Sequence, residues 1–434
     1  MEKLTFKYGL DQPLPLFSTM VFGLQWFIVV VPYIIILGMI AAGIHYVDSP
    51  ALQLQYLQKL FLVTGLTLFI QVLWGHKLPL VIGPAAVLLS GIVANRGDAS
   101  IGAVYLSVAL CGGVLAVLSW CNLLSRIHVL FTNRVIGIVL VLIAFTILPT
   151  ILQLIVTGTD NPFSQLVFAV MLVMAMLIGQ RFLPGAFKST IVIWALLIGS
   201  LAYYIFLANA WPTAAAPVQA SLGWELAVTG FEFDGVTVIS FLFCFLALTA
   251  NDIGSIQSTA GLLAVKDSGQ RSKSGLIVTG LGNLLAGCLG VMGPVNYSFS
   301  SGIIIATGCA ARFPLAVAGV GMILLACLPG IISLFSYIPP VVTGSLLFYT
   351  MCSQTAGGFM MLGKCLETSG FETGLIIGVS LMLGTLIAFM PAAMTATIPA
   401  VIRPLASNGF VIGVTTALIL EHVVYSQSGH TEKK

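Results

Sequence analysis

Residues 247–261 read ALTANDIGSIQSTAG and lie in the middle of a long apolar segment. The stretch carries two amides, one carboxylate and several hydroxyl groups. Polar side chains at that depth are costly unless they face a partner, a cavity or a ligand. We therefore expect this stretch to mark the functional site and the rest of the chain to be its scaffold.

The composition places the chain among membrane proteins. Of its 434 residues, 59% are hydrophobic and 7% are charged, whereas an ordinary soluble domain has about 25% charged residues. Apolar runs of about 20 residues recur from Phe17 almost to the C-terminus, and each can cross a hydrocarbon core of about 30 Å as a helix. The first run lacks a small-residue cleavage pattern, so we interpret it as a span and not as a signal peptide. These features predict an all-α polytopic membrane protein.

Several classes of function are disfavoured by the same composition. The eight cysteines are scattered singly, without paired or metal-ligand spacing. The net charge of +3 is modest, and the basic residues do not cluster as a nucleic-acid surface requires. We find no nucleophile pair or phosphate-binding loop that would indicate an enzyme. We expect neither a metal site nor a nucleic-acid partner, and no enzyme activity.

The apolar runs predict fourteen spans. They cover residues 17–43, 55–75, 79–94, 100–121, 133–158, 163–180, 188–209, 235–263, 274–290, 295–309, 313–336, 338–358, 371–390 and 401–424. With the N-terminus inside, the outside segments hold only Lys59, Arg96 and Arg403 of the 17 basic residues. Because basic residues concentrate in cytoplasmic loops, this distribution predicts a multi-pass plasma-membrane protein, of the bacterial inner-membrane kind, with both termini in the cytoplasm.

The third and tenth spans are unusual because each starts with an extended piece that contains Gly and Pro. The third begins LPLVIGP at residues 78–84, and the tenth begins VMGPVNY at 291–297. Each predicts a short extended segment followed by a half-helix. They are seven spans apart, which predicts two seven-span repeats that are inverted because seven is odd. Interrupted spans at matching positions of inverted repeats indicate a transporter's substrate site, although Gly/Pro kinks in ordinary spans are the alternative.

The eighth span carries the polar stretch. Asn251, Ser255 and Ser258 follow helical spacing and share one face. Asp252 lies about 100° further around the helix, and it is the only acidic residue deep inside a span. No basic residue lies comparably deep, so the sequence offers Asp252 no obvious partner. Two hypotheses stay open: Asp252 couples transport to a proton or binds a cation, or it is a structural carboxyl group that is protonated or bonded to backbone.

Five short runs carry a resemblance to a known family. They are GLQW at residues 23–26, GPAA at 83–86, NDIGSI at 251–256, GIIIATG at 302–308 and RPLASNG at 403–409. In this order they resemble motifs of the nucleobase/ascorbate transporter family, also called the xanthine/uracil permeases. The likeness extends over the whole chain and agrees with the predicted topology.

The resemblance implies a fold and an activity. The fold is fourteen spans in seven plus seven inverted repeats, with a core domain at residues 1–132 and 234–336 and a gate domain at 133–233 and 337–434. Members usually form homodimers through their gates. The implied activity is secondary transport of a purine- or pyrimidine-type nucleobase, similar to xanthine, uric acid or uracil. The implied mechanism is alternating access of the core domain against the gate domain. Transport would be a proton symport, with Na⁺ as the other candidate coupling ion, and no cofactor is expected.

The departures from the family pattern define a divergent member. Asn251 stands where the family places a carboxylate, and Phe299 and Ser300 replace an acid or amide followed by Asn. An amide can still donate to and accept from a ring lactam, and an aromatic ring can stack on a flat heterocycle or simply fill space. We predict Asp252 for ion coupling. The predicted substrate-binding residues are Gln25, Trp26, Ala85, Ala86, Asn251, Ser255, Tyr297, Phe299 and Ser300.

An alternative keeps the fold and changes the cargo. An uncoupled uniporter, or a transporter of small anions as among the sulfate-transporter relatives that resemble this fold, would hold an anion at the two half-helix N-termini. It predicts no stimulation by a proton gradient.

Overall fold

A computed structural model describes residues 6–47, 49–123, 132–156, 161–183, 187, 190–207, 230–265, 267–368, 370–399 and 402–425. Most of the predicted outer loop between spans 7 and 8 lies outside this part of the chain. Six basic residues of the predicted topology also lie outside it: Lys3, Arg126, Lys188, Lys266, Lys433 and Lys434.

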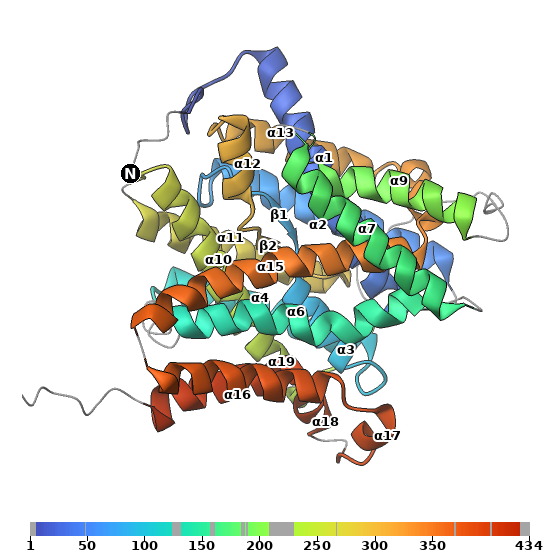
Figure 1. The fold of residues 1–434 in the computed structure, drawn as a ribbon. Helices are drawn as coiled ribbons and strands as arrows, with labels where there is room; N and C mark the ends of the chain where they lie inside the picture. Colours follow the sequence, from blue (N-terminus) through green and yellow to red (C-terminus); the bar gives the residue numbers. More distant parts are fainter. Residues whose placement is uncertain are drawn as a thin grey trace, which may run out of the picture.

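The described chain is mostly helical (Figure 1). Its first half contains α1 (Leu16–His45), α2 (Pro50–Leu73), β1 (Ile82–Pro84), α3 (Ala86–Ala94), α4 (Ile101–Trp120), α6 (Asn133–Val156), α7 (Pro162–Phe182) and α9 (Ile191–Phe206). Its second half contains α10 (Gly235–Leu262), α11 (Ser268–Leu289), β2 (Pro294–Asn296), α12 (Ser300–Thr307), α13 (Phe313–Ala326), α14 (Pro329–Ser333), η2 (Leu334–Tyr337), α15 (Pro340–Thr368), α16 (Phe371–Ala388), α17 (Ala392–Thr395), α18 (Arg403–Ala406), α19 (Gly409–Ile419) and η3 (Leu420–Val424). Among the described residues, seven helices are long and apolar enough to cross a membrane, or eight if one bent pair counts as a span.

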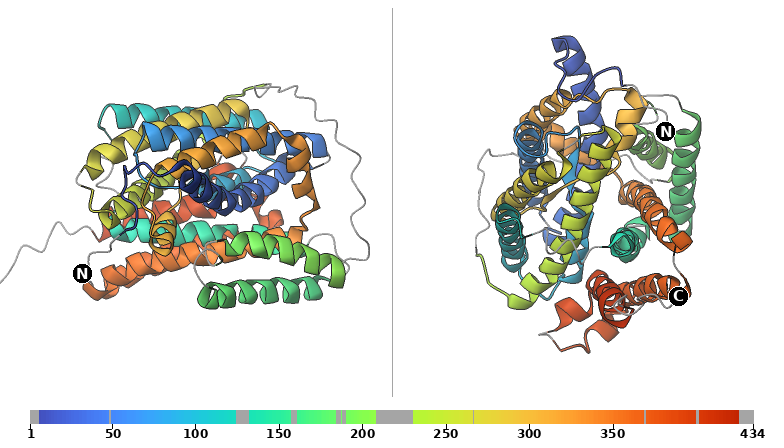
Figure 2. Two further views of the ribbon diagram at one scale, coloured as in Figure 1. Left: turned by 90° about the horizontal axis from the view of Figure 1, so that it is seen from above. Right: turned by 90° about the vertical axis from the view of Figure 1, so that its left-hand side faces the viewer.

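The helices pack in two groups (Figures 1 and 2). In one group α4 packs along α11 and α13 packs along α2 and α1, with α10 beside α4. In the other group α6 packs along α15, and α16 packs along α19. Contacts between helices of different groups are sparser.

Glycines let α4 and α11 approach closely. A Cβ atom at Gly112 of α4 would lie 2.6 Å from the backbone nitrogen of Leu284, and one at Gly287 of α11 would lie 2.4 Å from that of Ala109. Small residues of this kind permit backbone-to-backbone packing of helices in membranes. α10 packs against both helices of this pair, and β2 packs against α11.

The two interrupted segments have the predicted shape. β1 and β2 form an antiparallel two-stranded ladder in which Ile82 faces Asn296 and Pro84 faces Pro294. Each strand runs directly into a short helix, α3 after β1 and α12 after β2. Because the strands are antiparallel, the N-termini of α3 and α12 adjoin opposite ends of the same ladder.

Two other predicted spans are not single helices, and both predictions are corrected here. The span at 313–336 is bent by 85° between α13 and the α14–η2 segment, because Pro329 disfavours helical dihedrals at Leu328 (φ −115°, ψ 70°). The span at 401–424 is divided into α18 and α19 by Asn408, whose side chain accepts from the backbone N–H groups of Phe410 and Val411. An N-cap residue of this kind begins a new helix.

Candidate substrate site

The ladder, the two half-helices and α10 meet in one place. α10 contacts α3, α12 and β2, and α1 contacts β1. α10 therefore lies beside both interrupted segments, and its polar stretch bonds to β2 through Asn251, Asp252 and Ser255. Figure 1 shows β1 and β2 in the interior of the molecule, between the long helices.

Asp252 is fully buried, and both of its carboxylate oxygens accept hydrogen bonds. Its Oδ1 accepts from the backbone N–H (2.7 Å) and from the side-chain Nδ2 (2.8 Å) of Asn296. Its Oδ2 accepts from the Thr279 hydroxyl (2.6 Å), and its residue exposure is 0%. Thr279 Oγ1 in turn accepts from Gln71 Nε2 at 3.0 Å. The carboxylate thus joins α10 to β2 and α11.

Asn296 connects this carboxylate to the predicted substrate face. The backbone carbonyl oxygen of Asn296 accepts from Asn251 Nδ2 and from Ser255 Oγ, both at 3.3 Å. Asn251 is half-buried, whereas Ser255 is buried and also donates to the Asn251 carbonyl at 2.8 Å. Within this network Asn251 is therefore more exposed than the buried Asn296, and the Ser255 hydroxyl bonds to the backbone carbonyl of Asn251.

Three aromatic rings gather at the start of α12. Phe299 stacks on Tyr33 of α1 with centroids 5.0 Å apart and planes 24° apart. Tyr297 contacts both rings, at 5.1 Å from Phe299 and 5.6 Å from Tyr33. The Tyr297 hydroxyl donates to the Pro84 carbonyl at 2.8 Å, and a Cβ at Gly83 would lie 2.4 Å from its oxygen. Glycine is therefore required at 83 so that this ring can cover β1.

The other predicted residues have different positions. Ala85 is buried and donates its N–H to the Gly293 carbonyl at 2.9 Å, while Ala86 is half-buried at the start of α3. Ser300 is buried, accepts from Val81 N at 3.0 Å and donates to the Tyr297 carbonyl at 2.6 Å, so its hydroxyl holds the fold. Gln25 is half-buried, and Trp26 is 2% exposed.

The ring of α1 that stacks at the site is Tyr33, which the sequence reasoning did not select. Tyr33 follows Trp26 by two helical turns, or about 10 Å. Sequence reasoning also missed Asn296, Thr279 and His76. The one signal for Asn296 was its place two residues after Pro294 in the interrupted segment.

One side of α10 faces open space. A Cβ at Gly254, Gly261 or Gly302 would meet no described heavy atom within 4 Å. Gln257, Ser258 and Ser298 are exposed around these glycines, and Ser301 is half-buried. This side of α10 and α12 therefore carries exposed polar side chains. Among the described residues, no group of three or more His, Cys, Asp and Glu side chains is placed to hold a metal ion.

Two half-helices that begin at a buried ladder, beside a polar helix face, define the protein as a membrane transporter. The sequence-family model of the xanthine/uracil permeases, described as "Permease family", matches residues 17–393 of this chain. The chain therefore belongs to that family and is a permease, not an enzyme.

Relatives of known name are similar at low identity over most of their length. The xanthine permease of Bacillus subtilis is 23% identical over 88% of this chain and 88% of its own. The uric acid permease PucJ of the same organism is 23% identical, covering 85% and 84%. The nucleobase transporter PlUacP of Paenibacillus larvae is 24% identical, covering 85% and 86%.

Solved structures share the fold. The transmembrane domain of the cyanobacterial bicarbonate transporter BicA aligns with a TM-score of 0.61 at 14% identity, over 86% of this chain and 96% of that one. Murine Solute Carrier 26 family member A9 aligns with a TM-score of 0.57 at 12% identity, over 94% and 69%. These likenesses establish the architecture and not the cargo.

Proposed function

We propose that the protein is a secondary transporter that moves a purine- or pyrimidine-type nucleobase, of the xanthine, uric acid or uracil kind, across the plasma membrane. The observation on which this depends is the half-buried Asn251 amide beside the ladder after which both half-helices begin, together with the Tyr33–Phe299 ring pair at the start of α12. The amide can pair with a ring lactam, the rings can stack on a flat heterocycle, and the helix termini offer N–H donors. The names of the relatives support the same substrate class.

A flat heterocycle fits this site better than a small inorganic anion does. The side chains that we place at the open edge of the site are an amide, hydroxyls and aromatic rings, and none of these carries a positive charge. A small anion would depend on the two helix termini alone. Anion transport on the same fold therefore remains the second candidate, which the binding test below distinguishes.

We also propose alternating access of a core domain against a gate domain, with fourteen spans in two inverted repeats, cytoplasmic termini and a homodimer through the gates. Near the N-terminal end of α10 the two helix groups are joined. There Arg403 Nη1 lies 2.6 Å from Asp98 Oδ1, and Asn408 Nδ2 donates to Ser240 Oγ at 3.3 Å. Further along α10, a Cβ at Gly254 or Gly261 would meet no described heavy atom within 4 Å. Alternating access requires that contacts between the groups, such as those of Arg403 and Asn408, break and form again.

Proton symport is part of the proposal, with Asp252 as the predicted coupling group and Na⁺ as the other candidate ion. The hydrogen bonds on Asp252 support the competing hypothesis of a structural carboxylate. The two roles differ in the expected behaviour of Asp252→Asn, which is described in the Discussion.

Binding by purified protein tests the substrate class. We expect xanthine, uric acid or uracil to raise the unfolding temperature of the protein. We expect Asn251→Ala to raise the dissociation constant of the nucleobase about tenfold, because one hydrogen bond to the ring is lost. The matched control is Thr416→Ala in α19, whose hydroxyl bonds only to its own helix. If small anions raised the unfolding temperature and no heterocycle did, the nucleobase proposal would be abandoned.

A further inference from the structure

The turn after α2 directs His76 into the protein interior. Lys77 has a left-handed φ of 55°, and its N–H donates to the Gln71 carbonyl at 3.1 Å. The His76 N–H donates to Gln71 Oε1 at 3.2 Å, and the residue is 0% exposed. A Cβ at Gly275 of α11 would lie 3.2 Å from His76 Cβ, so the glycine leaves room for the ring.

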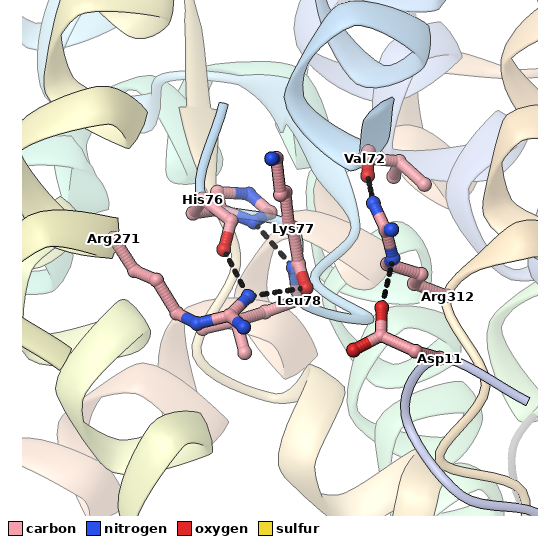
Figure 3. A network of polar contacts seen from close by, with 7 residues as sticks. All are labelled: Asp11, Val72, His76, Lys77, Leu78, Arg271 and Arg312. Carbon is pink, nitrogen blue, oxygen red and sulfur yellow. Dashed lines mark hydrogen bonds and ion pairs between the residues drawn. The ribbon is translucent and has the colours of Figure 1, made fainter. Parts of the chain in front are cut away.

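Two arginines hold the end of α2 from outside, as Figure 3 shows. Arg271 Nη1 donates to the carbonyl oxygens of His76 (3.0 Å) and Lys77 (2.9 Å). Arg312 Nη1 donates to the Val72 carbonyl (2.5 Å), and its Nε donates to Asp11 Oδ1 (2.7 Å). Cations at a helix C-terminus are favourable, so the turn that carries His76 is fixed from both sides.

The hydrogen bonds assign the tautomer of His76. Its Nδ1 accepts from the Leu78 N–H at 3.0 Å. The proton therefore resides on Nε2, which lies 3.0 Å from Asn296 Oδ1 and donates to it. Burial lowers the pKa of His76 to about 3, Asn296 opposes the shift and Arg271 adds to it. The ring is thus neutral near pH 7.

This donor decides which way the Asn296 amide points. With Oδ1 toward His76, Nδ2 faces Asp252 Oδ1 at 2.8 Å. A flipped amide would place two donors together at His76 and two acceptors together at Asp252, and buried mismatches of this kind are costly. His76 and Asp252 therefore hold the side chain of Asn296 from opposite sides. This keeps the backbone carbonyl of Asn296 in place to accept from Asn251.

We propose that His76 is a positioning residue for the substrate site: by donating to Asn296 Oδ1 it fixes Asn296, and through the Asn296 carbonyl it fixes the Asn251 amide that meets the substrate. This inference rests on the proposed function for the identity of the ligand. It does not depend on it for the geometry of the network.

The experiment compares His76→Gln with His76→Asn. Glutamine places an N–H donor near the former Nε2, whereas asparagine retains only the acceptor near Nδ1 for Leu78. We expect His76→Gln to keep the affinity for the nucleobase, and the transport KM, within about twofold of the wild-type values. We expect His76→Asn to raise the transport KM about tenfold with little change in maximal rate. His45→Asn, at the half-buried C-terminal end of α1, controls for the replacement of a histidine by an amide elsewhere.

A second measurement does not need the substrate. Hydrogen exchange over residues 291–300 should be faster in His76→Asn than in wild type and nearly unchanged in His76→Gln. The inference is overturned if the two variants share one KM, or if His76→Asn leaves this exchange unchanged. If wild type binds no nucleobase, the proposed function fails, and the exchange result alone decides the role of His76.

Discussion

Asp252→Ala is expected to leave little folded protein. The change strands three donors in a dry site, namely the Asn296 N–H, the Asn296 side-chain amide and the Thr279 hydroxyl. Each buried unsatisfied group costs about 1–3 kcal/mol, and whole domains are stable by only about 5–15 kcal/mol. We expect a loss of most detergent-extractable monodisperse protein, measured by fluorescence size-exclusion chromatography and thermal unfolding.

Asp252→Asn distinguishes anchoring from coupling. The remaining Oδ1 can still accept from both Asn296 donors, while the new amide faces Thr279, whose hydroxyl already accepts from Gln71. We therefore expect a milder destabilisation of about 1–3 kcal/mol. If Asp252 is an anchor, the variant keeps the wild-type response of transport to a pH gradient. If Asp252 couples the proton, the variant still binds substrate but no longer accumulates it against a gradient.

Uptake into proteoliposomes with and without an inward proton gradient measures this difference. Thr279→Val serves as the matched comparison, because it removes one donor to the carboxylate without altering the charge at position 252. The anchor hypothesis fails if Asp252→Ala accumulates and unfolds like wild type. The coupling hypothesis fails if Asp252→Asn accumulates substrate as wild type does.

Gly112→Ala is expected to destabilise the core strongly, whereas Gly113→Ala one residue later is not. At Gly112 the new Cβ would lie 2.6 Å from Leu284 N and 2.8 Å from Asn283 Cβ, so α4 and α11 must move apart. At Gly113 the nearest atom is Leu284 Cδ1 at 3.8 Å, an ordinary contact. Overpacking costs about 1–3 kcal/mol, while alanine in place of glycine favours a helix by about 1 kcal/mol.

Thermal unfolding of both variants in the same detergent measures the contrast. We expect the unfolding temperature to fall by several degrees in Gly112→Ala and to rise or stay level in Gly113→Ala. Substrate affinity should fall in Gly112→Ala as well, because α11 carries Thr279 and supports β2. Equal unfolding temperatures for the two variants would show that α4 and α11 are not in direct backbone contact.

Sequence patterns predicted the class of protein and the two interrupted segments correctly where the cause is local. Apolar runs predict helices, and Gly and Pro at 83–84 and 293–294 mark the interrupted segments, because these residues act on the backbone at their own position. Pro329 and Asn408 act equally locally, yet their breaks were missed, since hydropathy averages over a whole span and conceals a break within it.

The sequence by itself determined that this is a polytopic membrane protein, that two of its segments are interrupted, and that Asp252 lies deep in an apolar helix. Only the tertiary structure decided what Asp252 touches. Thr279 is 27 residues from it and Asn296 is 44 residues from it, and His76 reaches Asn296 across 220 residues. Such partners depend on how helices rotate and approach one another, which hydropathy and spacing do not specify. For the same reason the stacking ring of α1 is Tyr33, two turns beyond the tryptophan that the motif suggested.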